Sequence, residues 1–600
     1  MNRDVQGDSE LPRAMNRRTA LKQLAGAGAL GLIAPPTLSA GDSNAVAPSP
    51  LVKDQIRFWL ETSLRRVYPT SPPGSALPLR LLTARAARLS FQACFRNDRP
   101  NSVILRCEVL GAEDCRPVVR RVGFVPLRAF NTYTPKEELE GAGFIPGLCP
   151  DPLFPEAAAH IGPQANGAFW ISLFIPADAK PGPRPIKVRL TLENEFAYVD
   201  WTRPKPWSVE LPVVVDVQPL VLQPRRDFPV TKWISADSIW EYYKIEPCGE
   251  RFWQLANAYI ANMVAHGCDT LYTPIFNARH EILVRPAQLL RVKRPAPDQY
   301  EFDFTDVQRW VRIALKHGAR HLEFTHFFTP APTSGKHPQR IFERAGKIGP
   351  LLWPPEIRAT SETYRKFLSQ FLPQFRAFLE AEKILDRSFF HCADEPDGDA
   401  QMADYRKARA LLRELAPWMK VMDAMSDTRF ATERLSDMPI PSIVTAPEFT
   451  KANCPAWTYF CCGPRDSYLQ RLLDTPLPKI RMAGWLFYRL GARGFLHWGY
   501  NYWFVFCTAQ ISDPFLDAAV GAWPGLPAGD PFVVYPGAEG PIDSIRWEVF
   551  AESLQDYAML QSAGLKPDDP LLAPLKSYAQ FPKTEEWIES ARARLLRSPE

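Results

Sequence analysis

Ser388-Phe-Phe-His-Cys-Ala-Asp-Glu-Pro396 is the stretch around which the chain is organised. Its apolar, aromatic run predicts a buried strand, and Pro396 ends strand pairing because it has no N–H to donate. Asp394 and Glu395 are therefore expected where a strand opens into a loop. In a parallel α/β sheet or barrel, reacting groups collect at that end. A solvated acidic turn is the alternative interpretation of these nine residues.

Short apolar runs alternate with amphipathic stretches beyond Pro229. Strands that alternate with helices indicate parallel βα units, and eight such strands predict a closed (β/α)8 TIM-like barrel. The expected strands span residues 230–235, 270–276, 321–327, 388–393, 421–425, 443–446, 457–461 and 494–498. The expected helices span residues 251–266, 305–317, 361–382 and 402–415. The intervals between strands five, six and seven are too short for full helices, so reduced helices are expected there.

The part of the chain before the barrel has a different texture. Residues 50–68 have apolar residues at helical spacing, which predicts a helix. Short alternating runs separated by turn residues continue to about residue 222, and this regular pattern is typical of a β-sandwich. A chain of 600 residues is also too long for one core. We expect a multidomain fold: an N-terminal β-sandwich at 48–222, a catalytic barrel at 223–530, and a C-terminal helical extension at 531–600 packed on the barrel, including an amphipathic helix at 544–560.

The first 47 residues resemble an export signal. Asn16-Arg-Arg-Thr-Ala-Leu-Lys22 resembles a twin-arginine motif, an apolar region follows at 24–33, and small residues offer a cleavage site between Ala40 and Ala47. We expect the twin-arginine translocation machinery to be a partner and the protein to be periplasmic or extracellular. A disordered basic N-terminus is the alternative. No other segment reaches the ~18 apolar residues of a transmembrane helix, so no membrane span is expected.

Composition narrows the classes of ligand. The net charge of +5 is small for this length and no long basic stripe is present, so a nucleic-acid partner is not indicated. The nine histidines never fall into H-E-x-x-H spacing, and no metal or cofactor is required. The eleven cysteines form no disulfide framework, although Cys107 and Cys115 could pair after export. The 17 tryptophans suit flat sugar-binding walls as well as a large core.

Two adjacent carboxylates provide a general acid. They cannot both ionise easily, so one pKa is expected to rise, and glycosidic bond cleavage needs such an acid to protonate the leaving oxygen. A retaining mechanism also needs a nucleophile, yet the seventh strand, Trp457-Thr-Tyr-Phe-Cys-Cys462, carries no acid before Asp466. This absence favours a substrate that supplies its own nucleophile, the carbonyl of a 2-acetamido group. Asp394 would orient that amide, and Glu395 would act first as acid and then as base.

Several aromatic and polar residues are candidates for contact with a sugar. Gly494-Phe-Leu-His-Trp-Gly-Tyr-Asn-Tyr-Trp503 ends the eighth strand and brings Trp498, Asn501 and Trp503 toward one rim. An indole offers a flat wall, and an asparagine offers a donor and an acceptor for hydroxyls. Tyr459 could donate to the amide oxygen, and His326 ends the third strand. Core packing is the alternative for the aromatic residues, and a satisfied structural role is the alternative for His326.

Three motifs together resemble glycoside hydrolase family 123: Ala393-Asp-Glu-Pro396, Gly494–Trp503, and Ser544-Ile-Arg-Trp-Glu with Gln555-Asp-Tyr557. The resemblance implies an N-terminal β-sandwich, a C-terminal (β/α)8 barrel, and removal of β-linked N-acetylgalactosamine by substrate-assisted catalysis. It implies that Asp394 holds the acetamido group and that Glu395 is the acid/base. The helix with Arg546, Glu548, Asp556 and Tyr557 would lock the barrel. The chain departs from the family pattern at Glu552-Ser-Leu-Gln555.

Two other functions remain open from the sequence. A retaining glycosidase for another sugar would use a protein nucleophile, with Glu448 or Asp427 as the candidates. A non-catalytic barrel that binds glycans is the third hypothesis, although a binding module has no need of a crowded acid pair.

Overall fold

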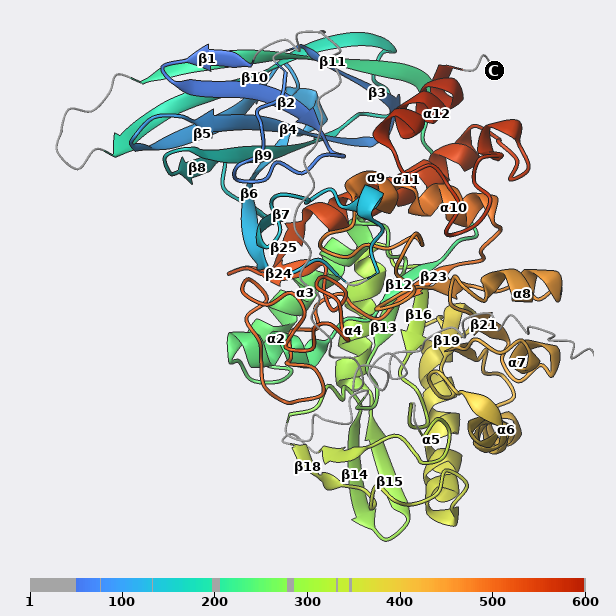
Figure 1. Cartoon of the computed structure of the whole chain (residues 1–600). Coiled ribbons are helices and arrows are strands. Elements are labelled where there is room, and N and C mark those ends of the chain that lie inside the picture. Colours follow the sequence, from blue (N-terminus) through green and yellow to red (C-terminus); the bar gives the residue numbers. More distant parts are fainter. Residues whose placement is uncertain are drawn as a thin grey trace, which may run out of the picture.

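The computed structural model describes residues 50–75, 77–131, 133–196, 206–277, 285–330, 333–344 and 348–597 (Figure 1). The predicted twin-arginine signal at 1–47 lies outside the described residues. Figure 1 shows a layered β region at one end of the molecule, a parallel sheet with helices at the other, and C-terminal helices between them. No helix in the described ranges is both long enough and apolar enough to cross a membrane.

Two sheets form the N-terminal β region. The larger has the order β1-β2-β4-β9-β6-β7-β25-β24, and the smaller has the order β3-β11-β10-β5-β8. Buried side chains of both, such as Phe91 and Phe169 from the first and Val188 and Val213 from the second, share one apolar core. The strands are β1 (Leu51–Lys53), β2 (Ile56–Thr62), β3 (Leu79–Arg85), β4 (Arg88–Asn97), β5 (Ser102–Leu110), β6 (Val118–Leu127), β7 (Gly147–Phe154), β8 (Ala158–Ile161), β9 (Ala165–Phe174), β10 (Gly182–Phe196) and β11 (Trp207–Val221).

The helix predicted at 50–68 is wrong. This segment forms β1 and β2, and β2 pairs with β4 along its whole length, from Ile56 opposite Asn97 to Thr62 opposite Phe91. Consecutive Phe58, Trp59 and Leu60 are all buried. Burial on both faces gives apolar spacing that a helix would also show, so pairing with a distant strand decides the element.

Six parallel strands form a half-barrel in the C-terminal region, in the order β19-β16-β13-β12-β23-β22. Two further strands pair with each other in parallel. Isolated parallel bridges join Phe390 to Val421 and Ser442 to Tyr459. In chain order the eight strands are β12 (Val230–Lys232), β13 (Thr270–Thr273), β16 (His321–Phe324), β19 (Ser388–Phe390), β20 (Met422–Ala424), β21 (Met438–Ile440), β22 (Thr458–Tyr459) and β23 (Phe495–His497).

The sixth strand is the one that the sequence placed wrongly. It was expected at 443–446, whereas β21 ends at Ile440 and Ala446 begins a helix with Pro447 in its first turn. The four long helices are confirmed as α3 (Glu250–Ala265), α4 (Thr305–His317), α5 (Glu362–Ala381) and α6 (Gly398–Leu415). The reduced helices after strands five and six are also confirmed, as α7 (Arg429–Thr432) and α8 (Ala446–Lys451). The other short helices are α2 (Ala236–Tyr243), α9 (Leu477–Arg481) and α10 (Ala483–Arg489), and two hairpins pair β14 (Arg291–Ala296) with β15 (Gln299–Asp303) and β17 (Phe342–Arg344) with β18 (Ile348–Leu351).

The C-terminal segment joins the two regions. Strands β24 (Val534–Pro536) and β25 (Pro541–Ser544) extend the larger N-terminal sheet through β7. Helix α11 (Ile545–Ser562) was expected to be amphipathic but is buried around most of its surface, acids and arginine included. Arg546 pairs with Asp151 of β7 at 2.9 Å, and both side chains are fully buried. Helix α12 (Glu585–Arg597) contacts β3 and β11, so the extension packs on the β region as well as on the half-barrel.

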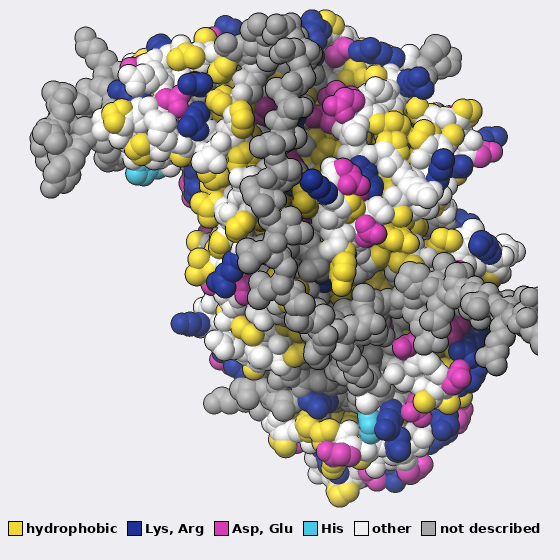
Figure 2. All heavy atoms as spheres, viewed as in Figure 1, with side chains coloured by type: hydrophobic (Ala, Val, Ile, Leu, Met, Phe, Trp, Pro, Cys, Tyr) yellow, Lys and Arg dark blue, Asp and Glu magenta, His cyan; other side chains and the backbone are white. Residues whose placement is uncertain are grey.

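Charges of both signs cover the surface. Figure 2 shows Lys, Arg, Asp and Glu side chains interspersed over the described residues of one face. This distribution accords with the small net charge of +5.

Candidate active site

The backbone breaks from strand geometry at the acid pair. Strand β19 ends at Phe390, and α6 begins at Gly398. Glu395 has φ of +45°, in the left-handed region that non-glycine residues rarely adopt. The Ser334 hydroxyl donates to the carbonyl of Asp394 at 2.6 Å, and the N–H of Glu395 donates to the carbonyl of Ala424 at 3.1 Å. Because consecutive strand residues point to opposite faces, this break is what can bring two adjacent acids to one site.

Glu395 is held by a tyrosine from another strand. The hydroxyl of Tyr459, at the end of β22, donates to Glu395 Oε1 at 2.9 Å. Burial, with the nearby charge of Glu395, keeps the pKa of Tyr459 well above its usual range, so the phenol stays protonated as a donor. The structure therefore brings together two of the predicted site residues.

Asp394 lies beside a third predicted residue, His326. His326 Nε2 is 4.0 Å from Asp394 Oδ1. The His326 ring stacks on that of His391, with centroids 4.2 Å apart and planes 26° apart. Asp394, Glu395, Tyr459 and His326 thus form one cluster at the ends of β16, β19 and β22.

A buried hydrogen-bonded group lies next to this cluster. His391 Nε2 lies 2.7 Å from Glu323 Oε1 of β16, and its Nδ1 lies 3.1 Å from Asp423 Oδ1 of β20. Burial favours the neutral imidazole, but the hydrogen bonds to Asp423 and Glu323 outweigh it and raise the pKa of His391 to about 10. The two carboxyl groups therefore favour the imidazolium form. Burial raises the pKa of Asp423, and this effect exceeds the lowering of the pKa by the hydrogen bond with His391.

Trp233 forms a wall of the same cluster. It follows β12 directly, is half-buried, and donates its indole N–H to Glu323 at 2.6 Å. Its ring stacks on Tyr272 at 5.4 Å and meets His326 edge-on at 5.5 Å. A half-buried indole next to His326 is a suitable platform for the apolar face of a pyranose.

The three residues predicted on the eighth-strand rim lie in different surroundings. Trp498 is mostly buried and donates its indole N–H to Asp530 at 2.8 Å. Asn501 is fully buried, and its amide exchanges two hydrogen bonds with the backbone of Ser235, at 2.8 and 3.0 Å. Trp503 is fully buried and donates to the carbonyl of Val534. These positions favour packing over sugar contact for Asn501 and Trp503.

The alternative protein nucleophiles are placed unfavourably. Glu448 is exposed on α8. Asp427 accepts from the backbone and guanidinium of Arg429 at 2.6 to 2.9 Å. Burial raises the pKa of Asp427, but the bonds with Arg429 outweigh this effect and lower the pKa below its usual value.

The residues around His391 do not suit a metal ion. His326, His391 and Asp423 place ligand atoms within 4.8 Å of one another. A histidine ligand must offer a ring lone pair to the metal, yet each nitrogen of His391 is already within hydrogen-bond distance of a carboxylate. A second group, His266, Asp543 and Glu548, has its acids paired with Arg120. Cys107 and Cys115, which were considered as a disulfide, are both free thiols.

Sequence reasoning missed Trp233, Glu323 and Asp423. A signal existed for the two acids, because each interrupts an apolar run that was itself read as a strand. Buried carboxylates are rare unless they are paired, so an acid inside a predicted core strand indicates a buried partner. His391 lies within Ser388–Pro396, but sequence reasoning did not assign it to the site.

Comparison with known proteins bears on this geometry. Residues 233–563, more than half of the chain, match the family model "Glycoside hydrolase 123, catalytic domain". A family 123 glycoside hydrolase from Clostridium perfringens, described in terms of glycolipid glycan hydrolysis, has a TM-score of 0.67 at 15% identity, covering 90% of this chain and 97% of that one. Comparison with curated proteins gave no match.

Two other solved structures are similar only at low scores. A Bacteroides uniformis β-glucuronidase has a TM-score of 0.28 at 9% identity, covering 81% of this chain and 50% of that one. An Eisenbergiella tayi β-galacturonidase has a TM-score of 0.29 at 10% identity, covering 78% and 69%.

The match of residues 233–563 to the glycoside hydrolase 123 catalytic domain shows that the chain is a glycoside hydrolase. The chain belongs to glycoside hydrolase family 123. The resemblance seen in the three sequence motifs is thus confirmed at the level of the family. The overall fold of the chain resembles that of the Clostridium perfringens enzyme.

Proposed function

We propose that this protein is an exported glycosidase that removes a β-linked 2-acetamido sugar, N-acetylgalactosamine in the first instance, by substrate-assisted retaining catalysis. The observation that carries the proposal is the pair Asp394–Glu395 at a broken strand end, with Tyr459 bonded to Glu395 at 2.9 Å. The Clostridium perfringens enzyme is described in terms of glycolipid glycan hydrolysis, which agrees with a glycan or glycolipid end as the substrate here.

In the first step, Glu395 donates its proton to the glycosidic oxygen as the C1–O bond breaks. The carbonyl oxygen of the 2-acetamido group attacks C1 and forms a cyclic oxazolinium ion. Asp394 accepts the amide N–H and stabilises the positive charge that develops on nitrogen. The aglycone leaves as an alcohol, and no protein nucleophile is consumed.

In the second step, the Glu395 carboxylate takes a proton from water, whose oxygen attacks C1. The bond from C1 to the carbonyl oxygen breaks and the acetamide is restored, so the two inversions give net retention. The same residue serves as acid and then base. Tyr459 fixes the orientation of that residue through both steps.

We propose that the two parallel sheets close into a (β/α)8 barrel. The bridges Phe390–Val421 and Ser442–Tyr459 support this, because they join the edges of the half-barrel to β20 and β21. We further propose the division into 48–222, 223–530 and 531–600, with the last segment bound to both other parts.

Export is proposed from the sequence of residues 1–47, with the protein periplasmic or extracellular. Changing Arg17 and Arg18 to lysine should keep the protein in the cytoplasm, because the translocation machinery recognises the pair of arginines. Cell fractionation would measure this. Unchanged secretion of the double variant would contradict a twin-arginine signal.

The catalytic proposal is tested with aryl β-glycosides of N-acetylgalactosamine, N-acetylglucosamine, galactose and glucose. We expect hydrolysis of the 2-acetamido sugars alone, and its loss in Glu395→Gln and Asp394→Asn. Replacing the N-acetyl group by N-trifluoroacetyl should sharply lower kcat/KM, because the carbonyl oxygen becomes a weaker nucleophile. Hydrolysis of the galactoside or the glucoside would instead make Glu448 and Asp427 the candidate nucleophiles. Binding without turnover would favour the glycan-binding hypothesis.

A further inference from the structure

Three fully buried ionisable side chains lie beneath the acid pair and have no part in the proposed mechanism. Glu323, His391 and Asp423 are 0%, 1% and 0% exposed. They come from β16, from the residue after β19, and from β20, three neighbouring strands. Buried charges are costly, so a group of three calls for a reason beyond packing.

Asp423 holds the strand end from which the acid pair leaves. Its Oδ2 accepts the N–H groups of Cys392 at 3.1 Å and Ala393 at 3.4 Å, and the hydroxyl of Tyr405 at 2.6 Å. Ala393 directly precedes Asp394. One carboxylate oxygen therefore fixes the backbone immediately before the acid pair.

Glu323 is satisfied on both oxygens. Oε1 accepts from His391 at 2.7 Å and from the Trp233 indole at 2.6 Å, and Oε2 accepts from the Thr231 hydroxyl. His391 lies between the two carboxyl groups, with one ring nitrogen within hydrogen-bond distance of each. Glu323, His391 and Asp423, called here the charge relay, thus contain one more acidic group than basic groups.

We propose that the charge relay is a positioning device for the acid pair: Asp423 sets the backbone of Asp394 and Glu395, and the acid in excess over His391 adds negative charge next to them. This inference rests on the proposed roles of the pair. A nearby negative charge disfavours a second carboxylate and favours the cationic sugar of the transition state. Water is excluded around the relay, so the interaction is weakly screened.

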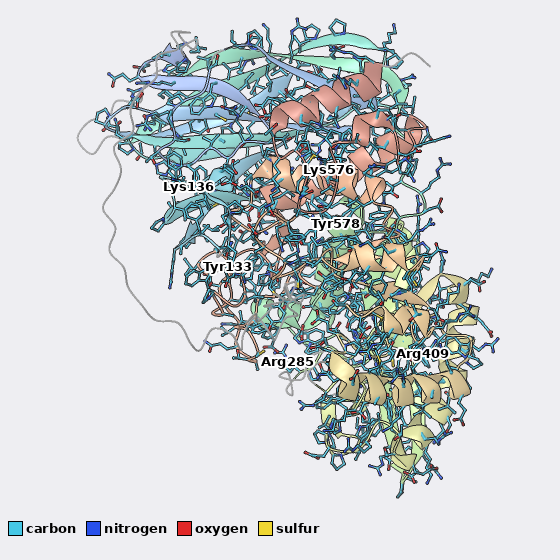
Figure 3. The ribbon with its side chains drawn as sticks, turned by 45° about the vertical axis from the view of Figure 1, so that its right-hand side comes forward. Tyr133, Lys136, Arg285, Arg409, Lys576 and Tyr578 are labelled. Carbon is cyan, nitrogen blue, oxygen red and sulfur yellow. The ribbon has the colours of Figure 1, made fainter. Side chains whose placement is uncertain are left out.

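Other ionisable groups face the relay and the acid pair from the surrounding elements. Tyr272 comes from β13 and Tyr459 from β22, and α6 contributes Tyr405 and Arg409, the latter labelled in Figure 3. The arginine is bonded to the carbonyl of Leu435 and to Asp437. Asp237, His326, Cys392 and Cys461 also lie near these groups. None of these is altered in the test below.

Glu323→Gln isolates the charge from the hydrogen bonds. Glutamine can place its carbonyl oxygen toward His391 and Trp233 and donate its N–H to the Thr231 hydroxyl, so the contacts survive while one acidic group is removed. We expect the basic limb of the kcat/KM profile to move down by about one pH unit, because the general acid loses its proton more readily.

Glu552→Gln is the matched control. Glu552 is equally buried and is bonded to the Ser63 hydroxyl and to Arg481, but it lies on α11. It should lower stability and leave the pH profile in place. A Glu323→Gln profile that does not move, or one that moves equally in Glu552→Gln, would overturn the charge part of the proposal.

Asp423→Asn tests the backbone clamp. Its amide cannot accept both N–H groups and the imidazolium at once, so we expect kcat to fall by about 100-fold or more with a smaller change in KM, in a protein that still unfolds cooperatively. A fall in stability with kcat unchanged would make Asp423 merely structural.

A titration separates failure of the relay from failure of the proposed function. In protein labelled with ¹⁵N-histidine, His391 should keep both ring protons from pH 6 to pH 9, and Glu323→Gln should lower the pH at which it loses one. A wild-type His391 that is neutral at pH 7 would overturn the relay even in an active enzyme. Absence of hydrolysis on all four glycosides would instead overturn the proposed function, while the titration would still decide the charge of the relay.

Discussion

The hydroxyl of Tyr459 lies 2.9 Å from Glu395 Oε1, although the two residues are 64 positions apart in the chain. The contact joins the seventh strand of the C-terminal region to the loop after the fourth. It explains how a strand without a carboxylate still contributes to the acid pair: it supplies the donor that holds one member.

Tyr459→Phe should lower kcat by about 10- to 100-fold, because a hydrogen bond to an ionised or ionising carboxyl is worth ~1.5–3 kcal/mol. Steady-state kinetics on the aryl 2-acetamido glycoside would measure it. Tyr535→Phe is the control, since Tyr535 donates to buried Asp151 at 2.7 Å, away from the acid pair. It should cost stability and leave kcat unchanged. Equal kcat for Tyr459→Phe and wild type would remove Tyr459 from the site.

Asn501→Ala distinguishes packing from sugar contact. The amide of Asn501 satisfies both the N–H and the carbonyl of Ser235, so its loss should destabilise the fold by about 1–3 kcal/mol. Urea unfolding would report this. A residue that only bound sugar would raise KM and leave the unfolding midpoint in place, and that pattern would restore the sequence-based role of Asn501.

Asp151→Asn should weaken the join between the β region and α11. Arg546 would be left as a buried charge with a poorer partner, at a cost of about 3–5 kcal/mol. Denaturant unfolding and limited proteolysis between the two regions would measure it. Glu193→Gln removes an exposed pair with Arg106 and should change stability by less than ~1 kcal/mol. Comparable losses in both variants would contradict a special role for the buried pair.

Lys232→Met should stabilise the protein. Lys232 is fully buried, its Nζ has no hydrogen bond within the described residues, and rings of Phe495, Trp547 and Phe550 lie 4.8 to 5.7 Å away. Burial, with Arg471 nearby, holds the pKa of Lys232 well below its usual range. Methionine removes an unsatisfied polar atom at similar volume, a gain of about 1–3 kcal/mol.

The pH dependence of that gain follows from the same shift. The unfolded chain binds a proton at Lys232 below pH ~10.5, whereas the folded chain does so only at a lower pH, so wild-type stability falls as the pH drops from the unfolded toward the folded pKa. The advantage of Lys232→Met should therefore be larger at pH 7 than at pH 10. Thermal unfolding at the two pH values would measure it, and an advantage independent of pH would mean that Lys232 is charged when folded.

Local periodicity predicted much of the fold. Seven of the eight strands after residue 229 and the four long helices appear near their expected positions, because apolar spacing within ten to twenty residues records which faces are buried. The wrong predictions share one cause, which is that each outcome depended on contacts beyond the local sequence. The segment at 50–68 is a pair of strands because of strand pairing, and the sixth strand ends before the position expected because a helix begins at Ala446. Helix α11 is buried on faces that local spacing assigns to solvent.

The sequence by itself determined the family, the acid pair, and its position at a strand end, because these depend on residues adjacent in the chain. Only the tertiary structure decided that Tyr459 and His326 contact the pair, that Asn501 and Trp503 face the interior, and that Glu323, His391 and Asp423 share one charge relay. Hydrogen bonds between strands far apart in sequence leave no periodic pattern in the local sequence. The partner of a buried charge is fixed only when the chain has folded around it.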